Sequence, residues 1–248
     1  MLNSIIDQSN DSINESVYYA GQLRATELQE ISLLEIFDAI RTGKNGLREK
    51  IQQIRALPTQ DERNALKPEI LPLFCWSTYK DNRRKNKLLE RSHFILLDFD
   101  HLNPETRLAE LRAAVRDDRR VYAAFVSPSG DGLKVMYKLD KDVTDPTRYT
   151  ELYIHYADIF SVEYGCPWDK STKDSARGCF LSYDPDIYVN KNATPLPVDV
   201  VVSVIPQSKK EAIAKALQGT NRGNRTYSAT QIAGFCVIMA FPKILRYR

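Results

Sequence analysis

The stretch that most constrains the fold is Phe94–Asp100, where four apolar residues lead into two aspartates separated by one phenylalanine. A short apolar run of this kind is typical of a β-strand buried on both faces. Because side chains alternate along a strand, Asp98 and Asp100 are expected to point to the same face. Like charges at that spacing repel, and each is costly to bury without a partner. The pattern favours a metal or a basic side chain between them; the alternative is a strand that ends in an acidic turn.

The elements expected around this strand have the order β-α-β-β-α-β. They are strand 94–100, a helix from Asn103 with Leu108, Leu111 and Val115 as its apolar stripe, strands 121–126 and 133–139, a helix from Asp145 to near Gly165, and strand 178–183. This order predicts an α+β fold with a ferredoxin-like core over about residues 93–190. Right-handed crossovers then place the strands in the order fourth, first, third, second.

That strand order predicts which loops meet at the two aspartates. The 94–100 strand would lie between the 133–139 and 178–183 strands and run antiparallel to both. Its carboxyl end would therefore lie beside the start of each neighbour, so the 127–132 and 166–177 loops are expected to converge on Asp98 and Asp100. Three polar stretches that are far apart in the sequence would share one edge of the sheet.

The 127–132 loop, Ser-Pro-Ser-Gly-Asp-Gly, has the composition of a phosphate-binding turn. Glycines let backbone N–H groups approach a phosphate, and hydroxyl groups and a following lysine add donors. The candidate nucleotide contacts are Ser127, Ser129, Gly130, Gly132 and Lys134. The alternative is an ordinary hairpin turn, for which the same residue types are common.

The 169–177 stretch offers Asp169 as a third carboxylate and Arg177 as a bidentate ligand for a triphosphate. Three carboxylates at one strand edge are what a two-metal phosphoryl transfer needs, and Mg²⁺ or Mn²⁺ prefers such oxygen ligands. The alternative is a surface loop with an Asp174–Arg177 ion pair, which would contribute little to stability.

A basic run precedes the 94–100 strand. Clustered lysine and arginine side chains bind nucleic-acid phosphates through counterion release, and the candidates are Arg83, Arg84, Lys85 and Lys87. The alternative is a solvated loop. The net charge of the whole chain is only +3, so a nucleic-acid site has to come from a local patch of this kind.

Length and composition indicate an ordinary globular protein of 248 residues with 43% apolar content. The polar start of the chain has no signal-peptide pattern, and no apolar run has the roughly 18 residues of a membrane span. The four scattered cysteines favour reduced thiols in a cytoplasmic protein. The expected layout is a flexible leader (1–20), a catalytic domain (21–205) with helices at 33–40 and 47–57, and a helical tail (206–248).

The stretches Phe94–Asp100, Ser127–Lys134 and Asp169–Arg177 together resemble the three motifs of archaeo-eukaryotic primases, which include primase-polymerases. Leu71–Phe74, Ser127–Gly130 and Phe180–Asp186 resemble the N-terminal domain of virulence-associated protein E. The resemblance implies that Asp98, Asp100 and Asp169 ligate metal, whereas Ser129, Lys134 and Arg177 contact nucleotide. Lys134 is a departure, because these primases generally carry a histidine in the second motif.

The resemblance implies a primase-polymerase-like nucleotidyltransferase in the DNA replication of a mobile element or a phage-like locus. The partners that it implies are nucleoside triphosphates, a single-stranded DNA template and a replicative helicase supplied by a separate chain. Lys134 keeps a second function open, that of a catalytically inactive nucleic-acid-binding module. A replication nickase is disfavoured, because the sequence lacks the His-x-His metal pair that such enzymes generally use.

Overall fold

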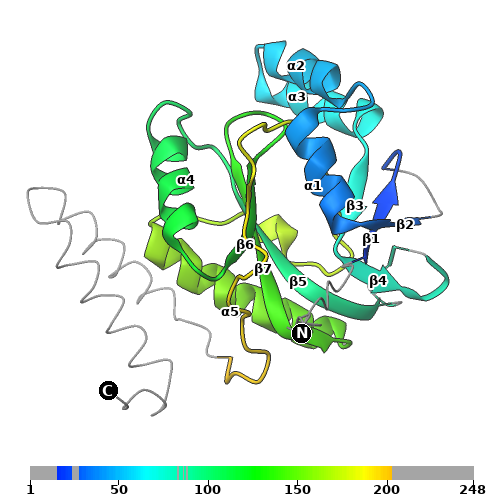
Figure 1. Cartoon of the computed structure of the whole chain (residues 1–248), viewed down its shortest axis with the longest axis vertical. Helices are drawn as coiled ribbons and strands as arrows, with labels where there is room; N and C mark the ends of the chain where they lie inside the picture. The colour runs from blue at the N-terminus through cyan, green and yellow to red at the C-terminus, as the bar shows by residue number, and fades with distance from the viewer. Residues whose placement is uncertain (1–15, 24–27, 83, 86, 88, 203–248) are drawn as a thin grey trace, which may run out of the picture.

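The computed structural model describes residues 16–23, 28–82, 84–85, 87 and 89–202 (Figure 1). The strands are β1 (Ser16–Ala20), β2 (Gln29–Ser32), β3 (Leu73–Cys75), β4 (Ser77–Tyr79), β5 (Leu89–Phe99), β6 (Val121–Val126), β7 (Leu133–Val143), β8 (Cys179–Phe180) and β9 (Tyr188–Val189). The helices are α1 (Leu33–Thr42), α2 (Leu47–Ala56), α3 (Gln60–Ile70), α4 (Arg107–Asp117) and α5 (Pro146–Tyr164), with short 3₁₀ turns η1 (Lys80–Asn82) and η3 (Lys170–Thr172).

The described strands form two antiparallel sheets in a mixed α+β fold. The five-stranded sheet has the order β4-β5-β7-β6-β9, and the four-stranded sheet has the order β2-β1-β3-β8. Within the larger sheet, β5 pairs with β7 in a register that places Asp98 opposite Lys134 and Phe99 opposite Leu133. The carboxyl end of β5 thus lies beside the start of β7, as the sequence predicts.

The expected ferredoxin-like order is not confirmed at its fourth strand. Strands β5, β7 and β6 lie next to one another in the predicted order. The predicted 178–183 strand, however, does not lie beside β5. Only Cys179–Phe180 is extended, as β8, and it pairs with β3 in the other sheet. The apolar β3 offers a second partner for such a strand, and the sequence pattern alone does not distinguish the two.

The larger sheet is buried on both faces, which explains the apolar run in β5. Ile95, Leu97 and Phe99 pack in one cluster with residues of α4 and α5. Phe94 and Leu96 face the other way and pack in a second cluster with residues of α1 and α2. Since side chains alternate along a strand, Asp98 lies on the second face, on the side of the N-terminal helices.

The N-terminal region contains more structure than the sequence predicts. Helices α1 and α2 lie where they are expected. Helix α3 is not among the expected elements, and Thr59 and Glu62 form the reciprocal cap that starts it. Pro68 is accommodated in the last turn of α3. The leader was predicted to extend to residue 20, whereas Ser16–Ala20 is β1, held between β2 and β3.

Some predictions concern residues outside the described ranges: positions 1–15 of the leader, Arg83 and the 206–248 tail. Among the described helices, none has the length and apolarity that crossing a membrane requires. Cys75, Cys166 and Cys179 are buried free thiols.

Candidate metal and nucleotide site

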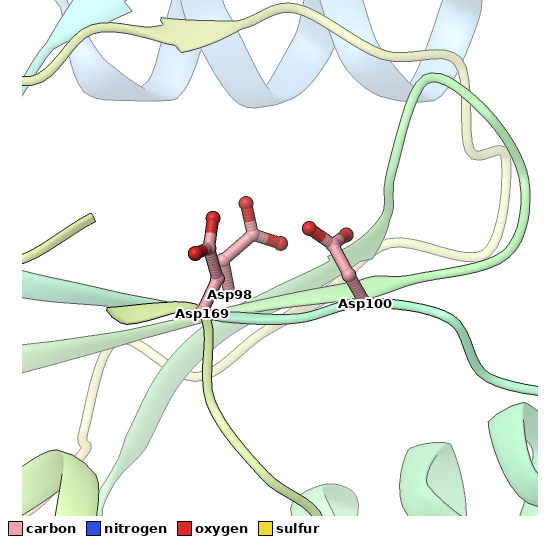
Figure 2. A group of neighbouring side chains, drawn as sticks. All are labelled: Asp98, Asp100 and Asp169. Carbon is pink, nitrogen blue, oxygen red and sulfur yellow. The ribbon is translucent and has the colours of Figure 1, made fainter. Parts of the chain in front are cut away.

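Three carboxylates from two separate segments meet at the end of β5. Asp98 and Asp100 come from the end of that strand and the residue after it, and Asp169 comes from the loop before η3. One carboxylate oxygen of each lies within 4.8 Å of the others. Figure 2 shows all three side chains directed to the same side of the strands. The structure therefore brings together the three acidic residues that the sequence singles out.

Asp169 is positioned by β5 itself, although β8 is absent from that sheet. The backbone N–H of Asp169 donates to the carbonyl of Asp98 at 2.9 Å. The Asp169 carboxylate accepts from the N–H and hydroxyl of Ser171 at 2.9 and 2.7 Å. The Tyr153 hydroxyl contacts the Thr172 hydroxyl at 2.7 Å and donates to the Leu96 carbonyl at 2.9 Å. The 166–177 loop is thereby fastened to β5 at two points.

Lys134 lies opposite Asp98 on β7, and its ammonium group donates to Asp98 Oδ2. Both side chains are buried, each with 10% of its surface exposed. Burial by itself would lower the pKa of Lys134, but the surrounding charges, with Asp98 the strongest, and the hydrogen bond to Asp98 together outweigh burial and hold the pKa above its ordinary value. This pairing fits the role of Lys134 as an internal counter-ion; its role as a phosphate ligand stays a prediction.

The second oxygen of Asp98 has no donor. Asp98 Oδ1 is buried without a hydrogen-bond partner, and the residue as a whole is only 7% exposed. The adjacent Asp100 carboxylate can supply a donor only in its protonated form. A buried carboxylate oxygen without a partner is costly, so this oxygen calls for a cation or a proton.

Asp100 is the carboxylate of the cluster whose pKa is clearly raised. Burial raises the pKa of its carboxyl group to about 6, with Asp98 adding to the shift and Lys134 opposing it. The sequence predicts that mutual repulsion raises the pKa of at least one carboxylate when metal is absent. When all three carboxylates are ionised, their negative charge is greater than the single positive charge of Lys134. A divalent cation among them would relieve the repulsion.

The 127–132 loop approaches the carboxylates closely, and Gly132 makes this possible. A Cβ atom on Gly132 would lie 2.6 Å from Asp100 Oδ1 and 2.9 Å from the Phe99 carbonyl oxygen. Gly130 has a φ of 86°, in the left-handed region that favours glycine. The Ser127 hydroxyl is buried without a hydrogen-bond partner, 3.1 Å from that Cβ position. Loop and carboxylates therefore form one continuous site.

Sequence reasoning misses the residues that hold this loop. The Arg55 guanidinium, from α2, donates to the Pro128, Ser127 and Tyr183 carbonyls at 3.3, 3.1 and 3.1 Å. The Asp184 carboxylate accepts from the Val126 N–H at 2.9 Å, directly before the loop. Arg55 follows the buried Ile54 on α2, and no periodicity or motif distinguishes it from a surface arginine.

The other two predicted nucleotide contacts, Ser129 and Arg177, differ in burial and in hydrogen-bond partners. Ser129 is buried, and its hydroxyl accepts from the Gln60 amide at 3.3 Å. Arg177 is exposed and donates to the Ser171 carbonyl at 3.2 Å, so it lies beside the Asp169 loop without bonding to a carboxylate of the cluster. The alternative Asp174–Arg177 pair is a backbone contact at 3.0 Å.

The described residues of the basic run before β5 differ in how far they are exposed to solvent. Arg84 is half-buried and donates to the Leu23 carbonyl at 3.3 Å. Its guanidinium also packs against Gly178, where a Cβ atom would lie 2.3 Å from Arg84 Nη1. Lys85 and Lys87 are exposed. Arg84 thus supports the fold, while the two lysines are left accessible.

The family model for the BT4734-like, N-terminal domain matches residues 65–189, which is half of the chain. The chain belongs to this family. The range matched by the BT4734-like model contains the three carboxylates, Lys134 and the 127–132 loop, and it begins within α3. The expected membership of the virulence-associated protein E family is not confirmed.

The solved structures similar to this BT4734-like chain include the AEP domain of the primase-polymerase of cyanophage S-2L. The similarity has a TM-score of 0.40 and 12% sequence identity, and it covers 75% of this chain and 86% of the cyanophage domain. No curated protein matches the chain.

Proposed function

We propose that this chain is a divalent-metal-dependent nucleotidyltransferase of the primase-polymerase type, which joins nucleotides on a single-stranded DNA template. The observation that carries the proposal is the Asp98–Asp100–Asp169 cluster, in which a buried carboxylate oxygen lacks a partner. Carboxylate oxygens are the ligands that Mg²⁺ and Mn²⁺ prefer. The oxygen of Asp98 that has no hydrogen-bond donor could bind any divalent cation of that class.

The three aspartates would hold the metal, and Lys134 would keep Asp98 oriented toward it. When bound, the metal would supply the positive charge that stabilises attacking and leaving oxygens in a phosphoryl transfer. Gly132 lies next to Asp100, and the unpartnered Ser127 hydroxyl beside it can bind a phosphate oxygen. The backbone N–H groups of Ser127 and Gly130 donate to the Gly132 and Ser127 carbonyls, so Gly130 would shape the loop through its left-handed backbone.

The proposal extends to the remaining partners. Ser129 and Arg177 would complete the nucleotide contacts, and the exposed Lys85 and Lys87 would contact the phosphates of the template. Replication of a mobile element in the bacterial cytoplasm, with a helicase supplied by another chain, is the setting that we propose for this activity.

The test is incubation of the full chain with single-stranded DNA, labelled ribo- or deoxynucleoside triphosphates, and Mg²⁺ or Mn²⁺. We expect labelled product with wild type and none with Asp98→Asn. Metal-dependent incorporation that survives Asp98→Asn would contradict the assigned site. DNA binding by both proteins, with no incorporation by either, would instead support the inactive nucleic-acid-binding module.

A further inference from the structure

One face of α3 carries a chain of polar contacts that leads from the 127–132 loop toward the carboxylates. Gln60, Asn64 and Lys67 are spaced i, i+4 and i+7, so they lie along one side of the helix. The Gln60 amide nitrogen lies 3.3 Å from both the Ser129 hydroxyl and Asn64 Oδ1. The Lys67 ammonium donates to the same Asn64 oxygen at 2.9 Å. This face of α3 therefore adjoins the loop at one end and presents a cation at the other.

Lys67 lies within the electrostatic field of the carboxylate cluster. Its side chain is half-buried. Burial lowers the pKa of Lys67 and the charge of Lys134 lowers it further, while Asp100, Asp131 and Asp98 act in the opposite direction. Leu66 and Ile70 of α3 pack against the cluster that contains Leu96, on the face of β5 from which Asp98 projects. Helix α3 therefore lies on the same side of the sheet as the carboxylates, and the electrostatic influence on Lys67 agrees with that placement.

The two lysines at the site differ in what they bind. Lys134 is paired with Asp98. Lys67 is held only by the neutral amide oxygen of Asn64, and among the described residues it makes no ion pair. A half-buried ammonium with a neutral acceptor gains most from an incoming anion, since a charged hydrogen bond is stronger than a neutral one. Lys67 is thus available for a ligand, whereas Lys134 is committed to the protein.

We propose that Lys67 binds the terminal phosphates of a nucleoside triphosphate whose inner phosphate lies at the Asp98–Asp100–Asp169 cluster. The inference rests on the proposed function, because it requires a nucleotide at that cluster. A polyphosphate carries its charge over several phosphate groups, so it can reach both a metal at the carboxylates and a lysine on the facing helix. Lysine binds such groups as a flexible point charge. Helix α3 would then close the nucleotide site from the side opposite β5.

The test compares wild type with Lys67→Gln, which removes the charge but keeps an N–H donor for Asn64. Lys67→Arg keeps the charge, and Lys191→Gln is the matched control at an exposed lysine outside the site. Binding of a nucleoside triphosphate, its monophosphate, inorganic triphosphate and single-stranded DNA is measured by calorimetry on the full chain. Ca²⁺ replaces Mg²⁺ in these titrations to prevent turnover. Mn²⁺ binding is titrated separately, and melting curves verify the fold of each variant.

We expect Lys67→Gln to weaken binding of the nucleoside triphosphate and of inorganic triphosphate about tenfold or more, from the loss of a charged hydrogen bond. Binding of the monophosphate and of Mn²⁺ should stay within roughly twofold of wild type, and Lys67→Arg should retain most of the triphosphate affinity.

Unchanged triphosphate affinity in Lys67→Gln would overturn the assignment and leave the proposed function intact. If only DNA binding weakened, Lys67 would contact the nucleic-acid backbone, which also overturns it. An equal loss of Mn²⁺ binding would indicate that Lys67 shapes the carboxylate cluster and would overturn it as well. A wild-type chain that binds Mn²⁺ but no triphosphate would overturn both the assignment and the proposed function.

Discussion

Two buried carboxylates, Asp118 and Asp98, each pair with a basic side chain, but they do so in opposite ways. Asp118 accepts from the Arg120 N–H and Nε at 2.9 Å through one oxygen, and from Arg120 Nη2 and the Tyr164 hydroxyl at 2.7 Å through the other. Arg120 also reaches Glu163 at 2.5 Å. Both oxygens of Asp118 are therefore satisfied within the protein.

Asp98 has a similarly low exposure but only one satisfied oxygen. Lys134 donates to Oδ2, Oδ1 has no donor, and two further carboxylates lie close to Asp98. Burial of an ionic group is tolerated when its hydrogen bonds are complete, and it is costly when they are not. The difference teaches which network serves stability and which awaits a ligand. The Asp118 network is complete without one, and the Asp98 network is not.

The largest expected effect is on catalysis. Asp98→Asn or Asp169→Asn should lower nucleotidyl transfer by roughly a thousandfold or more, because either change removes a ligand of a metal that supplies several kcal/mol of transition-state stabilisation. Initial rates of nucleotide incorporation measure this. Asp118→Asn is the control at the complete network, and it should retain activity within a few-fold at temperatures where it is folded. Full activity in Asp169→Asn would break the comparison.

The next effect is on stability in the presence of metal. Mn²⁺ at a hundred times its dissociation constant should stabilise the wild type by about 2.7 kcal/mol. For a domain of this size, that corresponds to a rise in melting temperature of about 5–10 °C. Thermal melts with and without Mn²⁺ measure it. The Asp98→Asn, Asp100→Asn double variant should show no such rise, and an unchanged response there would place the metal elsewhere.

Removal of the basic partner separates the two networks. Arg120→Ala should lower the free energy of unfolding by about 2 kcal/mol, because it leaves Asp118 buried without its cation and water compensates in part. This loss should be the same with and without Mn²⁺. Lys134→Ala should also destabilise the metal-free protein, but there Mn²⁺ should restore stability and bind more tightly than in wild type. Denaturant unfolding of both variants, with and without Mn²⁺, distinguishes the two outcomes.

The smallest effect is on the pH dependence of stability, where the signs are opposite. Burial raises the pKa of Asp118, but hydrogen bonds from Arg120 and Tyr164 outweigh it and hold the pKa below its ordinary value. The contribution of this network is thus present above the unfolded pKa of about 3.9 and is lost as pH falls through the folded pKa. The pKa of Asp100 is raised to about 6, so its ionised form costs stability above that pH.

For metal-free protein, we therefore expect the Asp100 cost to diminish as pH falls from about 6 toward the ordinary carboxyl pKa of about 4, and this relief should be absent in Asp100→Asn. At still lower pH, Asp118→Asn should lose less stability than wild type, because it has no carboxylate to protonate. Melting temperatures of the three proteins from pH 7 to 3 test both statements. A relief of equal size in Asp100→Asn would show that another group is responsible.

The parts of the site that the sequence predicts are those with local rules behind them. Alternation along β5 places Asp98 and Asp100 on one face, and alternation along β7 places Leu133, Val135 and Tyr137 in the cluster beneath α4 and α5. The cap at Asp145 starts α5 as expected. Periodicity and capping act within a few residues, and a single sequence contains that information.

The parts that were missed depend on contacts between distant segments. The choice of β3 over β5 as the partner of β8, and the attachment of Asp169 to the Asp98 carbonyl, are backbone pairings that leave no side-chain pattern. Arg55 and Lys67 lie on helices whose polar residues look solvent-facing in the sequence. Only the fold shows that the 127–132 loop and the carboxylates lie on the same side of the sheet as these helices. Helix α3 is not among the expected elements, and Pro68 inside it shows that a proline near a helix end does not exclude the helix.

The attachment of Arg55 to the 127–132 loop has a consequence for how the chain reaches its working state. Its hydrogen bonds to Pro128 and Tyr183 join positions 73 and 128 residues apart. Contacts of such long sequence separation form slowly, because the loops that they close carry a large entropic cost. We therefore expect the 127–132 loop to reach its final position beside the carboxylates late in folding, after α2 has packed near it. Under the proposed function, metal binding would then report on completed folding, and a partly folded chain would lack a formed metal site.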